Sequence, residues 1–101
     1  MEFSNVLKKI KMLLAKVTGN VVATQKDPTL VGHKLLLIRY LNLDGTPQGD
    51  EDTVVIDLCG AGIGDTVLIV DEGDAVQQIL GHANSPVNKM IIAIVDHYDI
   101  P

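Results

Sequence analysis

Cysteine is almost absent from this chain of 101 residues, which has only Cys59, so no disulfide can form within it. Disulfide-free chains are typical of reducing compartments, and we expect a cytoplasmic protein. Long apolar runs are absent as well. No stretch approaches the roughly 18 apolar residues of a membrane-spanning helix, and residues 1–20 lack the apolar core of a signal peptide. We therefore expect no membrane partner.

Aromatic and basic residues are also scarce. The chain has one Phe, two Tyr and no Trp. It has 8 Lys and Arg residues and 13 Asp and Glu residues, which gives a net charge of −5. A nucleic-acid surface needs cations that neutralise phosphates and rings on which bases stack. Neither is supplied here, so we expect no nucleic-acid partner.

No catalytic or metal-binding pattern is present. His33, His82 and His97 have no spacing typical of a zinc site. Cys59 would need a neighbouring base to act as a nucleophile, and the simpler interpretation is a buried, inert thiol. Asp44 and Asp57 give no acid–base pair. We expect no catalytic residue, no cofactor and no metal, and an enzyme remains only a third hypothesis, resting on Cys59.

What the sequence does contain is aliphatic strand-forming residues. Hydrophobic residues make up 47% of the chain, and most of them are Val, Ile and Leu. Gly19, inside the first apolar segment, predicts a bulge or sharp bend. The predicted strands are 14–24, 34–43, 53–58, 66–70 and 89–96.

A short helix is predicted over 72–80, with Asp74 as its N-cap and Gly81 as its end. Five strands with one helix between the fourth and fifth predict a mainly β fold, a five-stranded OB-like barrel. A chain this short buries little of its surface alone, so we also expect oligomerisation. The OB-like architecture leaves open a module that binds oligonucleotide or carbohydrate.

Residues 1–11 form a leader ahead of the expected domain, residues 12–101. Helical spacing in the leader relates four apolar residues, with lysines between them: Phe3, Val6, Leu7 and Ile10. Two interpretations remain open. The leader is either an amphipathic helix that docks on a partner or a disordered extension.

Glycines at 60, 62 and 64 raise the question of a phosphate-binding loop. Such loops open a helix, and a Walker loop continues with Lys-Ser or Lys-Thr. Here Gly64 is followed by Asp65, whose charge would repel phosphate, and then by a strand. Small residues in a row instead suggest positive φ angles or a close approach of another backbone. Several copies of this loop meeting at a symmetry axis would give such an approach.

Motifs in a fixed order resemble the pentameric vertex proteins of bacterial microcompartment shells, the type found in carboxysomes and in ethanolamine- and propanediol-utilisation compartments. The similarity spans residues 12–96. It rests on the opening segment Leu14–Thr24, on Asp57 with Gly60-Ala61-Gly62 and Gly64-Asp65, and on the closing Ile92–Asp96.

This resemblance implies a non-enzymatic shell protein that assembles as a cyclic homopentamer among hexameric shell proteins. It also implies that a loop lies near the five-fold axis, around a narrow pore: Gly60, Ala61, Gly62, Ile63 and Gly64. If such loops converge, their backbone N–H groups could hold an anion. The leader would then be a contact for cargo or for another shell protein.

Overall fold

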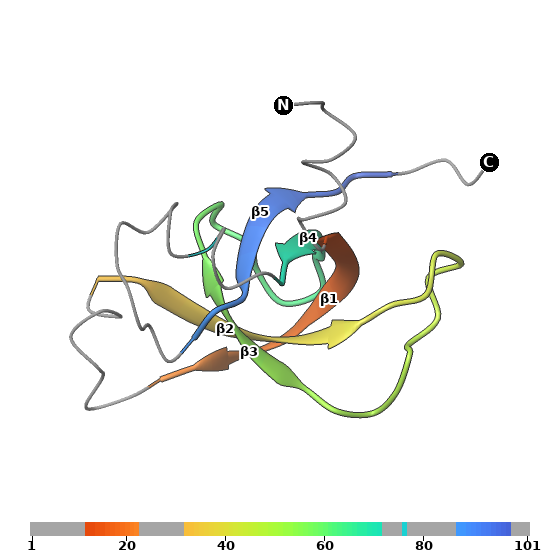
Figure 1. Ribbon diagram of the computed structural model, residues 1–101, viewed down its shortest axis with the longest axis horizontal. Helices are drawn as coiled ribbons and strands as arrows, with labels where there is room; N and C mark the ends of the chain where they lie inside the picture. The colour runs from red at the N-terminus through yellow and green to blue at the C-terminus, as the bar shows by residue number, and fades with distance from the viewer. Residues whose placement is uncertain (1–11, 23–31, 72–75, 77–86, 98–101) are drawn as a thin grey trace, which may run out of the picture.

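The fold is a closed barrel of five strands, seen in a computed structural model that describes residues 12–22, 32–71, 76 and 87–97. Around the barrel the order is β1-β2-β3-β5-β4 (Figure 1). The strands are β1 (Met12–Val21), β2 (Lys34–Tyr40), β3 (Thr53–Asp57), β4 (Thr66–Val70) and β5 (Met90–Ile94). The predicted five-stranded barrel is therefore confirmed.

Pairing around the barrel is antiparallel except at one seam. β3 and β5 run parallel and share only two residue pairs, Ile56 with Met90 and Asp57 with Ile91. A parallel pair needs a crossover connection, which here consists of residues 58–65, β4 and the chain between β4 and β5. This short parallel ladder closes the barrel.

The bulge predicted at Gly19 is present. Val17 pairs with Ile38 and Gly19 pairs with Leu37, so Thr18 is the extra residue of β1. Six of the ten predicted strand limits differ from those of the structure by one to three residues. β1 begins at Met12 rather than Leu14. β2 ends at Tyr40 rather than Leu43, because a turn begins at Asn42, whose backbone N–H and C=O bond Thr46 and Gly45.

Apolar residues are buried on both faces of parts of the sheet, which explains the continuous apolar runs in the sequence. The barrel interior holds one cluster: Ala15, Val17, Leu36, Ile38, Val55, Ala61, Val67, Ile69 and Ile91. A second cluster consists of Leu35, Ile56, Val70, Val76 and Met90. Consecutive strand residues point to opposite faces, so neighbours such as Leu35 and Leu36 belong to different clusters.

The predicted helix over 72–80 lies outside the described residues apart from Val76, which is helical and fully buried. The leader, with Phe3, Val6, Leu7 and Ile10, also lies outside them. Among the described residues, no helix has the length and apolarity to cross a membrane.

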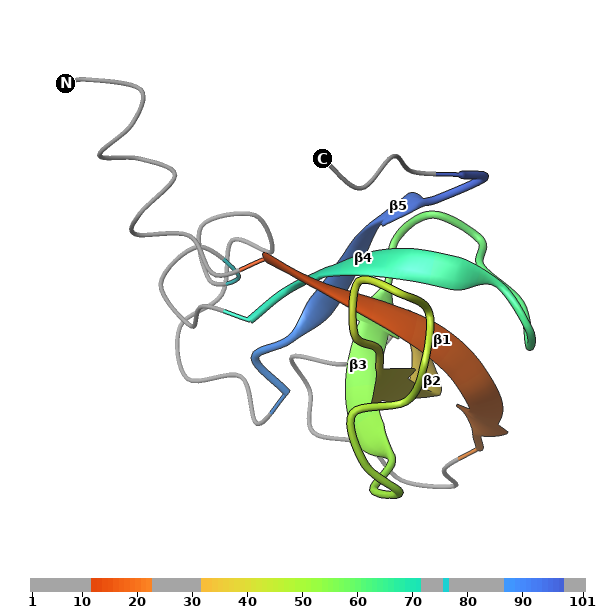
Figure 2. The ribbon, with the colours of Figure 1, turned by 90° about the vertical axis from the view of Figure 1, so that its right-hand side faces the viewer.

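Two connections leave the barrel in different directions. The β2–β3 connection extends away from the strands on the right of Figure 1, in yellow-green. The β3–β4 connection, residues 58–65, carries the three glycines and is called the glycine loop below; it curves around the right-hand end of the barrel in Figure 2, in green. The glycine loop therefore sits at the end where β3 finishes and β4 begins.

We expect Ile69→Ala to lower the free energy of unfolding by about 2–5 kcal/mol, because it leaves a cavity in the barrel interior. Val22→Ala is the control, since Val22 is 94% exposed and should change stability by less than about 0.5 kcal/mol. Urea unfolding at one fixed protein concentration measures both variants. Equal midpoints for the two would contradict the assigned interior.

Candidate functional site

The glycine loop is held by a buried carboxylate. Asp57, the last residue of β3, is 6% exposed. Its Oδ1 accepts a hydrogen bond from the Cys59 N–H at 3.0 Å, and its Oδ2 accepts one from the Ala61 N–H at 2.9 Å. An Asp side chain that bonds the backbone two residues ahead fixes a turn. The carboxylate thereby sets the path of the chain from β3 into the loop.

Lys34 completes this arrangement from the neighbouring strand. Lys34 and Asp57 are cross-strand partners in the β2–β3 ladder. The Lys34 Nζ donates to the Ala61 carbonyl at 2.8 Å and lies 3.8 Å from the Asp57 Oδ2. The ammonium group therefore bonds the loop backbone and also compensates the buried charge of Asp57.

The second half of the loop is held by another carboxylate. Asp65 accepts the Gly62 N–H at 2.9 Å through Oδ2, and the Asp65 N–H donates to the Gly62 carbonyl at 3.0 Å. This bond and a φ of 94° at Gly64 fit a type II turn with Ile63 and Gly64 at its centre. Two backbone hydrogen bonds connect the turn to β1. The Gly64 N–H donates to the Val17 carbonyl at 2.9 Å, and the Val17 N–H donates to the Asp65 carbonyl at 3.0 Å.

The three glycines differ in what requires them. Gly60 and Gly64 have φ angles of 75° and 94°, a region that other residues rarely adopt. Gly62 does not have a positive φ, and a Cβ built there would meet nothing closer than the Asp65 Oδ2 at 4.0 Å. Within one protomer, neither backbone conformation nor space demands a glycine at 62.

The predicted loop residues lie together, but they differ in exposure. Ala61 is fully buried in the barrel interior, whereas Ile63 is 63% exposed. Gly60 and Gly64 are exposed, and Gly62 is half-buried. Leu58 is exposed as well, so the loop presents two aliphatic side chains to its surroundings.

Cys59 was expected to be buried, and that expectation is wrong. The thiol is exposed, with its Sγ 3.7 Å from the Ile91 carbonyl. Asp57 requires the Cys59 backbone N–H, which places the residue at the start of an exposed turn regardless of its side chain. Within the described part of the chain, no group of three or more His, Cys, Asp or Glu side chains is placed to hold a metal ion.

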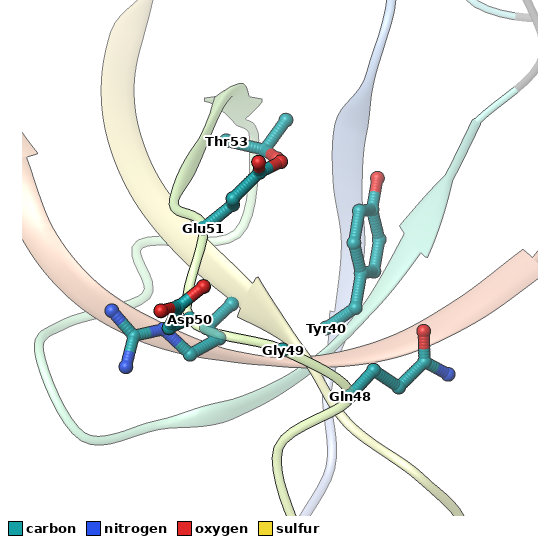
Figure 3. Close-up of a pocket in the computed structure, with 7 residues that line it drawn as sticks. Tyr40, Gln48, Gly49, Asp50, Glu51 and Thr53 are labelled. Carbon is teal, nitrogen blue, oxygen red and sulfur yellow. The ribbon is translucent and has the colours of Figure 1, made fainter.

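A shallow hollow of about 440 Å³ lies beside the β2–β3 connection. Figure 3 shows Tyr40 and Gln48 on one side of it and Asp50 and Glu51 on the other. The polar groups of Tyr40 and Gln48 already bond other parts of the chain. Tyr40 donates to Asp71 at 3.2 Å and Gln48 to the Leu41 carbonyl at 3.2 Å. Burial, and then the Asp71 carboxylate, raise the pKa of the Tyr40 hydroxyl above its ordinary range.

Three of the four Lys and Arg residues in the described part of the chain are paired with carboxylates, which gives little support to a nucleic-acid surface. The Lys34 Nζ lies 3.8 Å from a carboxylate oxygen of Asp57, and the Arg39 guanidinium lies 3.1 Å from one of Asp52. The Lys89 Nζ lies 3.7 Å from a carboxylate oxygen of Asp71. Cations paired in this way are less available to phosphates. The hypothesis of an oligonucleotide-binding module is therefore not favoured.

The roles of Lys34 and Asp57 in holding the glycine loop were missed in the sequence, although Asp57 belongs to the motif that carries the resemblance. Lys34 and Asp57 have no special spacing along the chain, and they meet only because β2 and β3 pair in this register. A usable signal did exist for Asp57, since an Asp three residues before a glycine commonly initiates a turn. Asp65 was noted for its charge and as part of the Gly64-Asp65 motif, whereas in the structure it is the acceptor that closes the second turn.

Comparison with known proteins gives one consistent result. A family model described as "Ethanolamine utilisation protein EutN/carboxysome" matches residues 12–96. The microcompartment shell vertex protein PduN of Salmonella typhimurium is 41% identical over 90 residues, covering 84% of this chain and 96% of PduN. The carboxysome shell vertex protein CcmL of Nostoc sp. is 41% identical over 85 residues, covering 84% and 83% of the two chains.

Solved structures agree with the sequence comparison. The pentameric microcompartment shell protein GrpN from Rhodospirillum rubrum superimposes with a TM-score of 0.75 at 31% identity, covering 88% of this chain and 99% of GrpN. CcmL of Gloeobacter violaceus gives a TM-score of 0.75 at 34% identity, covering 87% and 89% of the chains. The barrel is thus the fold of a family of shell proteins.

We expect Asp57→Asn to lower the free energy of unfolding by about 1–3 kcal/mol. The Asn side chain has one acceptor oxygen in place of two, so one of the hydrogen bonds from the Cys59 and Ala61 amides is lost. Asp50→Asn is the matched control, since Asp50 is exposed and the same charge is removed outside the glycine loop. Urea unfolding compares the stabilities, and amide exchange at Ala61 reports the local effect. If Ala61 exchanged equally slowly in both variants, Asp57 would not hold the loop.

Proposed function

Because the chain belongs to the EutN/CcmL family of microcompartment shell vertex proteins, we propose that it forms a cyclic homopentamer that caps the vertices of a bacterial microcompartment in the cytoplasm. Its role is structural, not enzymatic, as in the family. The observation that carries the proposal is the match over residues 12–96, which covers every strand of the closed barrel.

The pentamer supplies curvature. A five-fold unit set among hexameric shell proteins removes one sixth of the angle around its position, so a flat layer must close there. A ring requires a head-to-tail interface that closes on itself. Hexameric shell proteins are the proposed partners on the outer edge of the ring, and the leader, residues 1–11, is a proposed contact for cargo or another shell protein.

We place the glycine loop at the five-fold axis, with the segment Gly60–Gly64 around a narrow pore. Gly62 supports this placement, because nothing inside one protomer requires a glycine there. A neighbouring copy that approaches the backbone closely would require it. The exposed Leu58 and Ile63 would then gain apolar contacts in the ring.

Native mass spectrometry tests the ring directly. We expect a mass of five chains for the full-length protein and for a variant that begins at Met12, because the strands supply the interface. Removal of the leader should weaken only binding to a shell or cargo partner in a co-purification assay. A monomer or dimer of the full-length protein would overturn the vertex proposal.

The axis placement is tested separately by Gly62→Leu. We expect this variant to keep the far-ultraviolet spectrum of the folded barrel and to lose the pentamer, because five added side chains would collide at the axis. Gly49→Leu is the matched control: Gly49 also lacks a positive φ and has open space around its Cβ position. A stable pentamer for both variants would move the glycine loop away from the axis.

A further inference from the structure

We propose that the axial opening of the pentamer disfavours anions and admits cations and neutral solutes, because five of the eight backbone amides of the glycine loop are already bonded within each protomer. This inference rests on the proposed function, in which the glycine loop surrounds the axis. It reverses the expectation that convergent glycine loops would hold an anion.

Most amides of the loop bond acceptors inside the protomer. Five donors in residues 58–65 have an internal acceptor at 2.9–3.0 Å: the N–H groups of Cys59, Ala61, Gly62, Gly64 and Asp65. An anion-binding concavity requires successive N–H groups that are open to the ligand. Here the consecutive amides of Ala61 and Gly62 are turned to two carboxylates, Asp57 and Asp65. An anion would have to displace a carboxylate to reach them.

The charges around the loop act in the same direction. Asp57 is compensated by Lys34 at 3.8 Å. Asp65 is half-buried, and among the described residues it has no ion-pair partner. Its contact with the Gly62 N–H leaves its negative charge uncompensated, at the end of the barrel where the proposed axis lies.

Two further charged residues flank this end of the barrel. Lys16 is the cross-strand partner of Thr66, next to Asp65. Asp96 is exposed and follows Val95, whose N–H bonds the Thr66 carbonyl at 2.8 Å. Among the described residues at this end, the carboxylates of Asp57, Asp65 and Asp96 outnumber the ammonium groups of Lys16 and Lys34 by one in each protomer.

Five-fold repetition multiplies this excess of negative charge around one opening. A narrow passage with protein walls concentrates the field of its lining charges, and rings of acidic side chains favour cations in ion-conducting pores. Free backbone amides would counteract this field, but in this loop the N–H groups of Cys59, Ala61 and Gly62 bond the chain's own carboxylates. The opening therefore carries a negative potential.

Anomalous diffraction from crystals of the full-length pentamer soaked in rubidium bromide tests the inference, because the two ions are told apart at their absorption edges. We expect a rubidium peak on the five-fold axis at the level of Gly60–Gly64 and no bromide peak there. A bromide peak at that level, or neither ion, would overturn the charge preference.

The same crystals separate this inference from the proposed function, because they show which segment lines the axis. A ring whose axis is lined by another segment would overturn the axis placement itself, and the ion preference with it. A ring lined by the glycine loop with bromide bound would overturn the ion preference alone.

Asp65→Asn isolates the charge from the shape of the loop, because the Asn amide oxygen can still accept the Gly62 N–H. We expect this variant to keep the pentamer and to lose the rubidium peak. Asp50→Asn is the matched control, since it removes one exposed carboxylate from the hollow beside the β2–β3 connection. Rubidium retained in Asp65→Asn, or lost equally in Asp50→Asn, would refute the role given to Asp65.

Discussion

The buried Asp57 carboxylate is the interaction on which the glycine loop depends. A buried carboxylate is stable only when hydrogen-bonded and compensated in charge. Two backbone amides and Lys34 meet both requirements. The two amides that bond the carboxylate are those of Cys59 and Ala61 in the loop, so the carboxylate gains its hydrogen bonds only when the loop folds. The Ala61 methyl group is thereby placed in the barrel interior, which links the loop to the core.

Rigidity in this loop comes from hydrogen bonds rather than from residue size. Glycine runs are flexible when isolated, and Gly60 and Gly64 are present because their φ angles are positive. Asp57 fixes the first half of the loop, and Asp65 with Val17 fixes the second half. A loop built this way can present a defined backbone surface to a neighbouring copy without a large side chain.

Much of the fold could be predicted from the sequence because aliphatic runs and turn residues are local signals. All five strands and the bulge beside Gly19 follow from such signals. The end of β2 did not, because Leu41 and Leu43 continue the apolar pattern past the turn that begins at Asn42. The pairing of Lys34 with Asp57 depends on strand register, which no local pattern fixes. The direction of the loop amides depends on side-chain geometry and was likewise beyond the sequence.

The parallel seam between β3 and β5 has a consequence for how the chain folds. Ile56 and Met90 must meet across 34 residues of sequence, and only two residue pairs hold them together. The hairpin of β2 and β3 and the long pairing of β1 with β2 are more local and more extensive. Loop-closure entropy therefore makes the parallel seam a late contact, since only two residue pairs compensate for its closure, and β5 is held mainly by its four residue pairs with β4. The nascent chain would expose an incomplete barrel until its final strand arrives, so subunit assembly must wait for the C-terminal part of the sequence.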